Sequence, residues 1–287
     1  MTLTDHEMRH LAISLLNTPT ERDAQTRVGA SNLSNGCDYC LAAALSGVSR
    51  DSPATDRAWM GRTLGTSLHA TFEGHANSTS PHLSWFQDRY PDAEVEQHLM
   101  LGTLGGYGEM GGTPDLYLPT ENHLIDWKSS TRKKTALMRD CLGQTTYGRT
   151  HAALKLSEKV YAEEIEKANY KVTGYYGQTQ TYMLGKRRAG IPAEKATLVF
   201  VNRDGTGWFD DPLDKDYENL SRMQDVWVLS FDYNESYALQ VWDRGIELWD
   251  ALQSGKALND FESDPLCFPC GLDRVPETAT TTTAQAA

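Results

Sequence analysis

Apolar residues recur every three or four positions in several stretches of the chain, which is the spacing of an amphipathic helix. The clearest such face lies in residues 235–254 and is formed by Leu239, Trp242, Ile246 and Trp249. Gly255 follows this face and favours the end of the helix there. Spacing and composition together predict helices at residues 61–76, 151–170, 174–190 and 235–254.

Short apolar runs bounded by turn residues predict strands. The most apolar run, Ala196 to Asn202, predicts a buried strand, and the Gly-rich residues 102–112 predict a connection. Four more strands are predicted at residues 94–101, 112–118, 123–128 and 226–231. The resulting order of helix, sheet, helix, strand and helix predicts an α/β core.

Two of these strands, joined by the turn at residues 119–122, bring acidic side chains together. A hairpin that is symmetric about this turn places Asp115 opposite Asp126, with their Cβ atoms about 4.5–5.5 Å apart. The strand period of two puts Lys128 on the same face and turns Trp127 away. Two carboxylates that close are unfavourable unless a cation lies between them.

Carboxylates beside a lysine suit a particular chemistry. Their oxygen atoms are the ligands that Mg²⁺ and Mn²⁺ prefer, and such an ion activates water and neutralises charge in phosphodiester hydrolysis. The ammonium group of Lys128 would orient the water or stabilise developing charge. An Asp-x-Lys triplet alone also fits an ordinary solvated strand. The other motifs of the sequence are therefore needed to distinguish a hydrolytic metal site from such a strand.

The net charge at first argues against a nucleic-acid partner, because the chain has 27 basic and 39 acidic residues and a net charge of −12. The charge is unevenly spread, however. Residues 201–287 hold 6 basic and 17 acidic residues, whereas residues 128–203 hold 15 basic and 6 acidic ones. The basic middle includes the runs 132–134 and 186–188, and it leaves an electropositive track for DNA plausible.

The cysteines form two Cys-x-x-Cys pairs, Cys37 with Cys40 and Cys267 with Cys270, while Cys141 stands alone. Two such pairs predict a four-thiolate metal site that joins the two ends of the chain. Buried cysteines that happen to be spaced alike are the alternative. Four thiolates suit zinc or an iron–sulfur cluster.

Several motifs together carry a resemblance to a known family. His69 with Glu73, Gly112-Thr113-Pro114-Asp115, Ile125-Asp126-Trp127-Lys128, and Gln178 with Tyr182 occur in the order and spacing of the RecB-like branch of the PD-(D/E)XK nuclease superfamily. Over about residues 31–272 the chain resembles the CRISPR-adaptation-associated iron–sulfur exonucleases and their viral relatives. The resemblance implies a restriction-endonuclease-like core with a mixed central sheet flanked by helices, and a metal-dependent DNA exonuclease that acts in recombination, replication or spacer acquisition.

The resemblance also implies a role for each matching residue. His69, Asp115, Asp126 and the Trp127 carbonyl would bind Mn²⁺ or Mg²⁺, Lys128 would be the catalytic lysine, and Gln178 and Tyr182 would position the lysine and the DNA backbone. The superfamily often has Glu where this chain has Asp126. Related nucleases carry a four-iron four-sulfur cluster held by one cysteine before the core and three after it. Cys37, Cys267 and Cys270 match that pattern, and Cys40 would replace the missing fourth cysteine. Because of this difference, zinc stays an alternative to the cluster.

The sequence also predicts how the chain is organised. Residues 1–30 would be an N-terminal extension, 31–275 the nuclease domain, and 276–287 a disordered tail. No apolar stretch approaches the roughly 20 residues of a membrane span, and no secretory signal is recognisable, so we expect a cytoplasmic protein without membrane contact.

Two other functions stay open at this point. A non-catalytic subunit that binds DNA ends or assembles with a recombination or replication protein would use the acidic C-terminal third for docking. A four-cysteine zinc protein with an unrelated α/β core is the third alternative.

Overall fold

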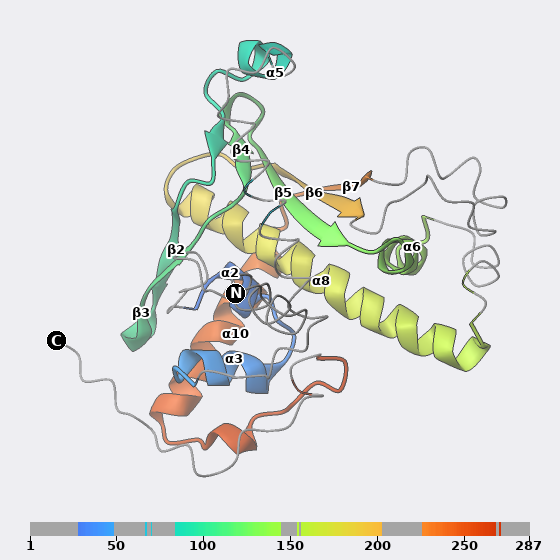
Figure 1. The fold of residues 1–287 in the computed structure, drawn as a ribbon. Coiled ribbons are helices and arrows are strands. Elements are labelled where there is room, and N and C mark those ends of the chain that lie inside the picture. The colour runs from blue at the N-terminus through green and yellow to red at the C-terminus, as the bar shows by residue number, and fades with distance from the viewer. Residues whose placement is uncertain are drawn as a thin grey trace, which may run out of the picture.

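The computed structural model describes residues 28–48, 84–144, 156–202 and 226–267, together with Ser67, Ala70, Leu154 and Cys270 (Figure 1). His69, Glu73 and nearly all of the predicted helix at 61–76 lie outside the described residues, as do the first 27 residues and the predicted tail.

A five-stranded mixed sheet forms one layer of the fold, with the strand order β1-β4-β5-β6-β7. Its strands are β1 (Glu94–Val95), β4 (Leu116–Leu118), β5 (His123–Ser130), β6 (Lys195–Asn202) and β7 (Val226–Asp232). Neighbouring strands are antiparallel except β5 and β6, which are parallel. The strands predicted at 196–202 and 226–231 and the predicted mixed sheet are confirmed.

The strand predicted at 94–101 is wrong as a single element. Glu96 adopts a left-handed conformation with φ 49°, which ends β1 and separates it from β2 (Leu99–Leu104). β2 then turns through a short 3-10 helix, η3 (Gly105–Tyr107), and pairs with β3 (Gly108–Gly112) in a separate hairpin. The glycines of 102–112 therefore belong to a hairpin rather than to the predicted connection.

The longest helix, α8 (Glu158–Arg188), is continuous where two helices were predicted. Within this helix, Gly177 lies where an added Cβ would meet the Ser34 Cβ at 3.0 Å, so the glycine allows α8 to pack closely against Ser34. Helix α10 (Glu235–Gln253) confirms the prediction at 235–254. Its buried face is rotated from the predicted one, because Val241 and Leu248 are buried while Leu239 is 36% exposed.

The remaining helices of the described residues are short. They are α2 (Ala30–Leu33), α3 (Asp38–Leu45), α5 (Ser84–Arg89), α6 (Arg132–Cys141) and the 3-10 turns η4 (Pro119–Glu121) and η6 (Leu258–Asp260). No helix within the described ranges is long and apolar enough to cross a membrane.

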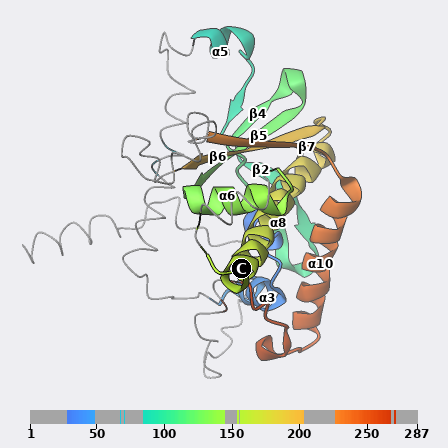
Figure 2. The same cartoon turned by 90° about the vertical axis from the view of Figure 1, so that its right-hand side faces the viewer.

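Helix α8 is the central layer of the molecule. It lies against one face of the sheet, and α2, α3 and α10 lie on its other side (Figures 1 and 2). A buried polar side chain fixes it to the sheet: the Gln180 amide donates to the Asp232 carbonyl at 3.0 Å and accepts from the Asn234 N–H at 2.8 Å. Side chains that reach α8 from the sheet therefore meet a rigidly placed helix face.

Candidate active site and four-cysteine centre

The hairpin of β4 and β5 has the register that the sequence predicts. The partner pairs are Leu116 with Ile125, Tyr117 with Leu124, and Leu118 with His123. Continuing this register by one residue places Asp115 opposite Asp126. The backbone N–H of Trp127 donates a hydrogen bond to Asp115 Oδ2 at 2.6 Å, which holds that carboxylate against β5.

The two carboxylates and the lysine are withdrawn from solvent together. Asp115 is 5% exposed, Asp126 is 2% exposed, and the Lys128 side chain is 12% exposed. Lys128 forms an ion pair with Asp126. Two carboxylates and one ammonium group leave an excess negative charge in a low-dielectric site, which is costly unless a cation balances it.

Lys128 is also held from the helix side. Its Nζ donates to Gln178 Oε1 at 3.1 Å, and Gln178 Nε2 donates to the Tyr182 hydroxyl at 3.2 Å. Gln178 and Tyr182 lie four residues apart on one face of α8, so a single helix face fixes the lysine. The structure thus brings together five sequence-predicted residues: Asp115, Asp126, Lys128, Gln178 and Tyr182.

Protonation in this cluster follows from burial and charge. Burial lowers the pKa of Lys128, but the Asp126 and Asp115 carboxylates outweigh it and leave that pKa above its ordinary value. Burial and the Asp126 charge raise the pKa of Tyr182 to about 12. Near neutral pH the lysine is therefore charged and the tyrosine keeps its proton.

Tyr175 belongs to the same cluster, although the sequence reasoning missed it. Lys128 Nζ lies 5.1 Å from the centroid of the Tyr175 ring, within cation–π range, and the ring also packs against Phe200 at 5.8 Å. Tyr175 precedes Gln178 by three residues and Tyr182 by seven. That helical spacing was the signal in the sequence, because all three positions share one face.

Gly112 explains part of the Gly-Thr-Pro-Asp motif. An added Cβ at Gly112 would lie 2.5 Å from Tyr182 Cε1, which is closer than atoms can approach. The residue at the end of β3 must therefore lack a side chain for the buried Tyr182 ring to keep its place beside Gln178. The motif brings Asp115 to β5 and leaves room for the tyrosine from α8.

Only part of the basic run at 186–188 is open to solvent, since Arg187 and Arg188 are exposed and Lys186 is not. Lys186 is buried, pairs with Glu94 and lies 4.2 Å from the Tyr117 ring centroid. Arg188 donates to the Leu101 carbonyl at 3.0 Å and lies over an aromatic ring of α10. Part of the charge counted in the basic middle therefore stabilises the core contacts of α8.

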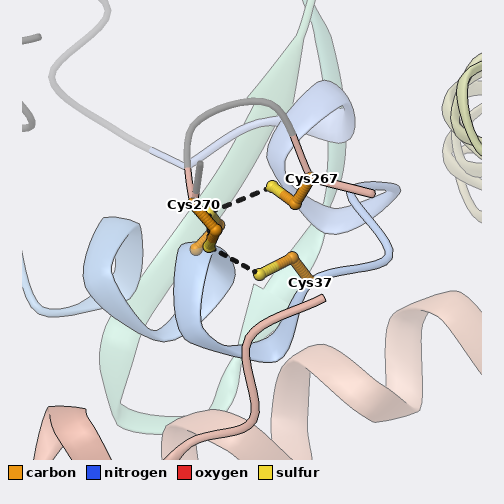
Figure 3. Close-up of side chains that lie close together, drawn as sticks. Cys37, Cys267 and Cys270 are labelled. Carbon is orange, nitrogen blue, oxygen red and sulfur yellow. Dashed lines mark hydrogen bonds between the residues drawn. The ribbon is translucent and has the colours of Figure 1, made fainter. Parts of the chain in front are cut away.

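The four paired cysteines converge on one point from opposite ends of the described chain. Figure 3 shows three of them, Cys37, Cys267 and Cys270. The sulfur atoms of Cys37, Cys40, Cys267 and Cys270 all lie within 4.8 Å of one another. Neighbouring Sγ atoms are 3.2 to 3.4 Å apart. This group could bind a metal ion, as the two Cys-x-x-Cys pairs predict.

The surroundings of the cysteines are polar and connected to α8. Asn35 Oδ1 accepts hydrogen bonds from the Cys37 N–H at 3.1 Å and from the Tyr170 hydroxyl at 2.7 Å, and Tyr170 belongs to α8. The Asp264 N–H donates to the Cys37 sulfur at 3.4 Å. Hydrogen bonds from the Cys40 thiol and the Cys270 backbone outweigh burial and hold the pKa of Cys267 below its ordinary value.

Comparison with known proteins gives structural likeness at low sequence identity. No protein-family model and no curated protein matches the chain. Similar solved structures include a complex of LHK-Exo with dAMP (14% identity, 80% of this chain and 89% of that one, TM-score 0.42). A phage-related exonuclease from Haemophilus somnus 129PT is also similar (14% identity, 80% and 96%, TM-score 0.36). So is a candidate exonuclease from Eubacterium rectale (12% identity, 98% and 96%, TM-score 0.46). At TM-scores below 0.5, the chemistry of this chain has to be inferred from its own side chains.

Proposed function

We propose that the protein is a metal-dependent deoxyribonuclease that hydrolyses phosphodiester bonds in DNA and acts as an exonuclease. One observation carries the proposal. Asp115 and Asp126 lie opposite each other on adjacent strands, and Lys128 shares their buried site and is held there from α8. Such a group is costly as a structural element, because replacing buried charges by apolar side chains is often neutral or stabilising.

The donor set fits a hard divalent cation. Asp115 and Asp126 offer carboxylate oxygens, and their combined charge exceeds that of the single lysine. In an extended strand the N–H and C=O of one residue point to the same side, so the Trp127 carbonyl is directed, like its N–H, toward Asp115. We propose these three groups as ligands, with His69 as a fourth, and Mn²⁺ or Mg²⁺ as the ion.

A bound divalent cation would supply an activated water and would neutralise negative charge on the phosphate. The protein's own side chains position the reacting groups. The Lys128 ammonium group orients the water or stabilises charge on the attacked phosphate. Gln178 fixes the ammonium group by accepting its hydrogen bond, and Tyr182 fixes the amide of Gln178 in turn.

Basic side chains beside the site favour an anionic polymer as substrate. β5 ends at Ser130, and α6 starts two residues later with the basic run 132–134. Lys133 and Lys134 are exposed there, and Lys133 pairs with Glu164 at 2.9 Å in a solvent-accessible ion pair that is weak enough to exchange for a phosphate. We propose that the DNA backbone passes over this end of α6.

A nuclease assay tests the proposal. Linear single- and double-stranded DNA with labelled ends is incubated with the protein and Mn²⁺ or Mg²⁺, and the expected result is cation-dependent release of the label. Asp126→Asn and Lys128→Met should each lower the rate about 100-fold or more, since each removes a group of the reacting site. Lys167→Met is the matched control, because Lys167 is an exposed α8 lysine paired with Glu164.

Two outcomes would count against the proposal. Absence of cleavage with either cation would contradict it, and binding of DNA ends without cleavage would favour a non-catalytic end-binding subunit. Cleavage that survives both site variants would show that other residues do the chemistry. Closed-circular DNA tests whether the protein is an exonuclease, because an exonuclease leaves such DNA intact and an endonuclease cuts it.

A further inference from the structure

The four-cysteine centre can be tested for the kind of metal that it fits, independently of the nuclease proposal. Its Sγ atoms all lie within 4.8 Å of one another, and three of the Sγ to Sγ contacts, Cys37 to Cys270, Cys40 to Cys270 and Cys40 to Cys267, measure 3.2, 3.3 and 3.4 Å. The question is which metal centre fits inside four sulfur atoms at this spacing.

A single tetrahedral ion fits. With a zinc to sulfur distance of about 2.3 Å, four thiolates at the corners of a tetrahedron lie about 3.8 Å apart. The sulfur atoms reach that separation by moving outward by a few tenths of an ångström. Rotation of the cysteine side chains suffices for such a shift, so the backbone can stay where it is.

A four-iron four-sulfur cluster does not fit these positions. Each thiolate of such a cluster binds a different iron, and the four irons with their bridging sulfides fill the space between the thiolates. The thiolates must then stand much farther apart than 4.8 Å. Cys37 and Cys267 are buried in the large hydrophobic core, so opening the group that far would disturb the packing of the α3 segment.

We propose that Cys37, Cys40, Cys267 and Cys270 bind one zinc ion in a closed, tetrahedral, structural site. Four thiolates complete the coordination of zinc and leave no position for a substrate. The pattern of two cysteines from each end of the chain, rather than one and three, gives the symmetric pairs typical of such sites.

The zinc site would brace helix α8. Cys37 is the residue before α3, and Cys267 and Cys270 follow η6, so the ion joins two segments that are more than 220 residues apart. Asn35 connects this junction to α8 through Tyr170, and Gly36 packs closely on the Tyr170 ring, because an added Cβ would lie 3.0 Å from it. The ion therefore fixes the α2 and α3 segment against α8.

Metal analysis of the full chain tests the proposal. Protein purified without oxygen from cells supplied with both iron and zinc is measured for zinc, iron and acid-labile sulfide. We expect one zinc per chain, no sulfide and no colour. Iron with sulfide, iron alone, or protein without metal would each overturn the proposal.

Variants and a spectroscopic probe make the test specific. Cys267→Ser should lose the zinc, whereas Cys141→Ser should keep it, because Cys141 lies outside the four-cysteine group and donates to the Met138 carbonyl. If Cys267→Ser fails to fold, Co²⁺ exchanged into the unaltered protein still tests whether the site is tetrahedral and bound by thiolates. The visible bands of tetrahedral thiolate-bound Co²⁺ support the proposal, and a spectrum of octahedral Co²⁺ contradicts it.

Discussion

Lys128 on β5 donates a hydrogen bond to Gln178 on α8, and this bond joins the strand that carries the acids to the helix beneath it. The two elements meet because of the topology. β5 and β6 are parallel, so the chain between them has to cross over the sheet, and α8 lies in that crossover. The contact between strand and helix that makes up the candidate site is thus a consequence of a single parallel strand pair.

A divalent cation should stabilise the protein through its acidic pair. We expect Mn²⁺ or Mg²⁺ to raise the melting temperature of the unaltered protein, by the equivalent of about 2.7 kcal/mol at a hundredfold excess over the dissociation constant. Asp126→Asn and Asp115→Asn should lose most of this shift, because each removes a charged ligand. Thermal unfolding at increasing cation concentration measures it. An equal shift in both variants would locate the cation elsewhere.

Tyr175 should act as a positioning residue for Lys128 if the proposed nuclease function holds. Tyr175→Leu removes the ring beneath the ammonium group and should lower the cleavage rate about 5- to 30-fold, as expected for a desolvated cation–π contact of about 1–2 kcal/mol. Tyr175→Phe keeps the ring and should keep most of the rate. DNA affinity should change little in either variant.

Tyr176→Leu is the matched control for this experiment. Its ring packs on Phe231 and Tyr237 and not on the lysine, so it reports the cost of losing any aromatic ring from α8. If Tyr176→Leu and Tyr175→Leu slow cleavage equally, the positioning role is excluded.

Two glycines of α8 should respond in opposite directions to the same change. Gly185→Ala should destabilise the protein, because the added Cβ would lie 2.9 Å from a Leu101 side-chain atom and 3.2 Å from the Met100 carbonyl oxygen. At Gly174 the nearest atom would be the Ser34 carbonyl oxygen at 3.7 Å, so Gly174→Ala should gain up to about 1 kcal/mol from its higher helix propensity. Denaturant unfolding of both variants measures the difference. A gain at both positions would mean that β2 moves away from α8 at little cost.

The ion pair of buried Lys186 with half-buried Glu94 should be costly to break from the Glu94 side. Glu94→Gln leaves the Lys186 charge without its partner and should cost about 3 kcal/mol of unfolding free energy. Adding Lys186→Met should recover much of that loss, because the methionine fills the same space over Tyr117 without a charge. The four proteins of this double-mutant cycle give the coupling by denaturant unfolding. Additive losses would show that the two residues act separately.

His123 should make stability depend on pH. Burial and nearby Lys195 lower the pKa of His123, and its Nε2 lies 2.7 Å from the Thr197 hydroxyl oxygen. The unfolded chain then binds the proton more readily than the folded one. The stabilisation by the neutral ring is complete above the unfolded pKa of about 6.5 and is lost as the pH falls through the lower folded pKa. His123→Gln should flatten this part of the profile in unfolding measured between pH 5 and 7. An unchanged profile would assign the pH dependence to other groups.

The sequence predicts the hairpin well because its information is local. A four-residue turn and the strand period of two are enough to place Asp115 opposite Asp126 and to turn Lys128 toward the same face. The helix spacing of Gln178 and Tyr182 is equally local. Tyr175 shares the same helix spacing, but the sequence reasoning missed it because its role depends on the position of Lys128.

Other features depend on contacts that the sequence pattern does not reveal. The close approach of Gly177 to Ser34 is not visible in the sequence, and the break at Glu96 depends on the pairing of β1 with β4. The charge of Lys186 reads as a solvent-facing feature until Glu94 is placed beside it. In each case tertiary packing overrides a local preference.

The junction of Cys37 with Cys270 also sets an order of events during synthesis. These two residues are separated by 233 positions, so the ribosome needs roughly ten to fifty seconds to make the second after the first, at about 5–20 residues per second. Throughout that time the N-terminal cysteine pair is exposed without its partners. A nascent chain therefore has to protect two thiols from oxidation and from premature metal capture before the fold can close around them.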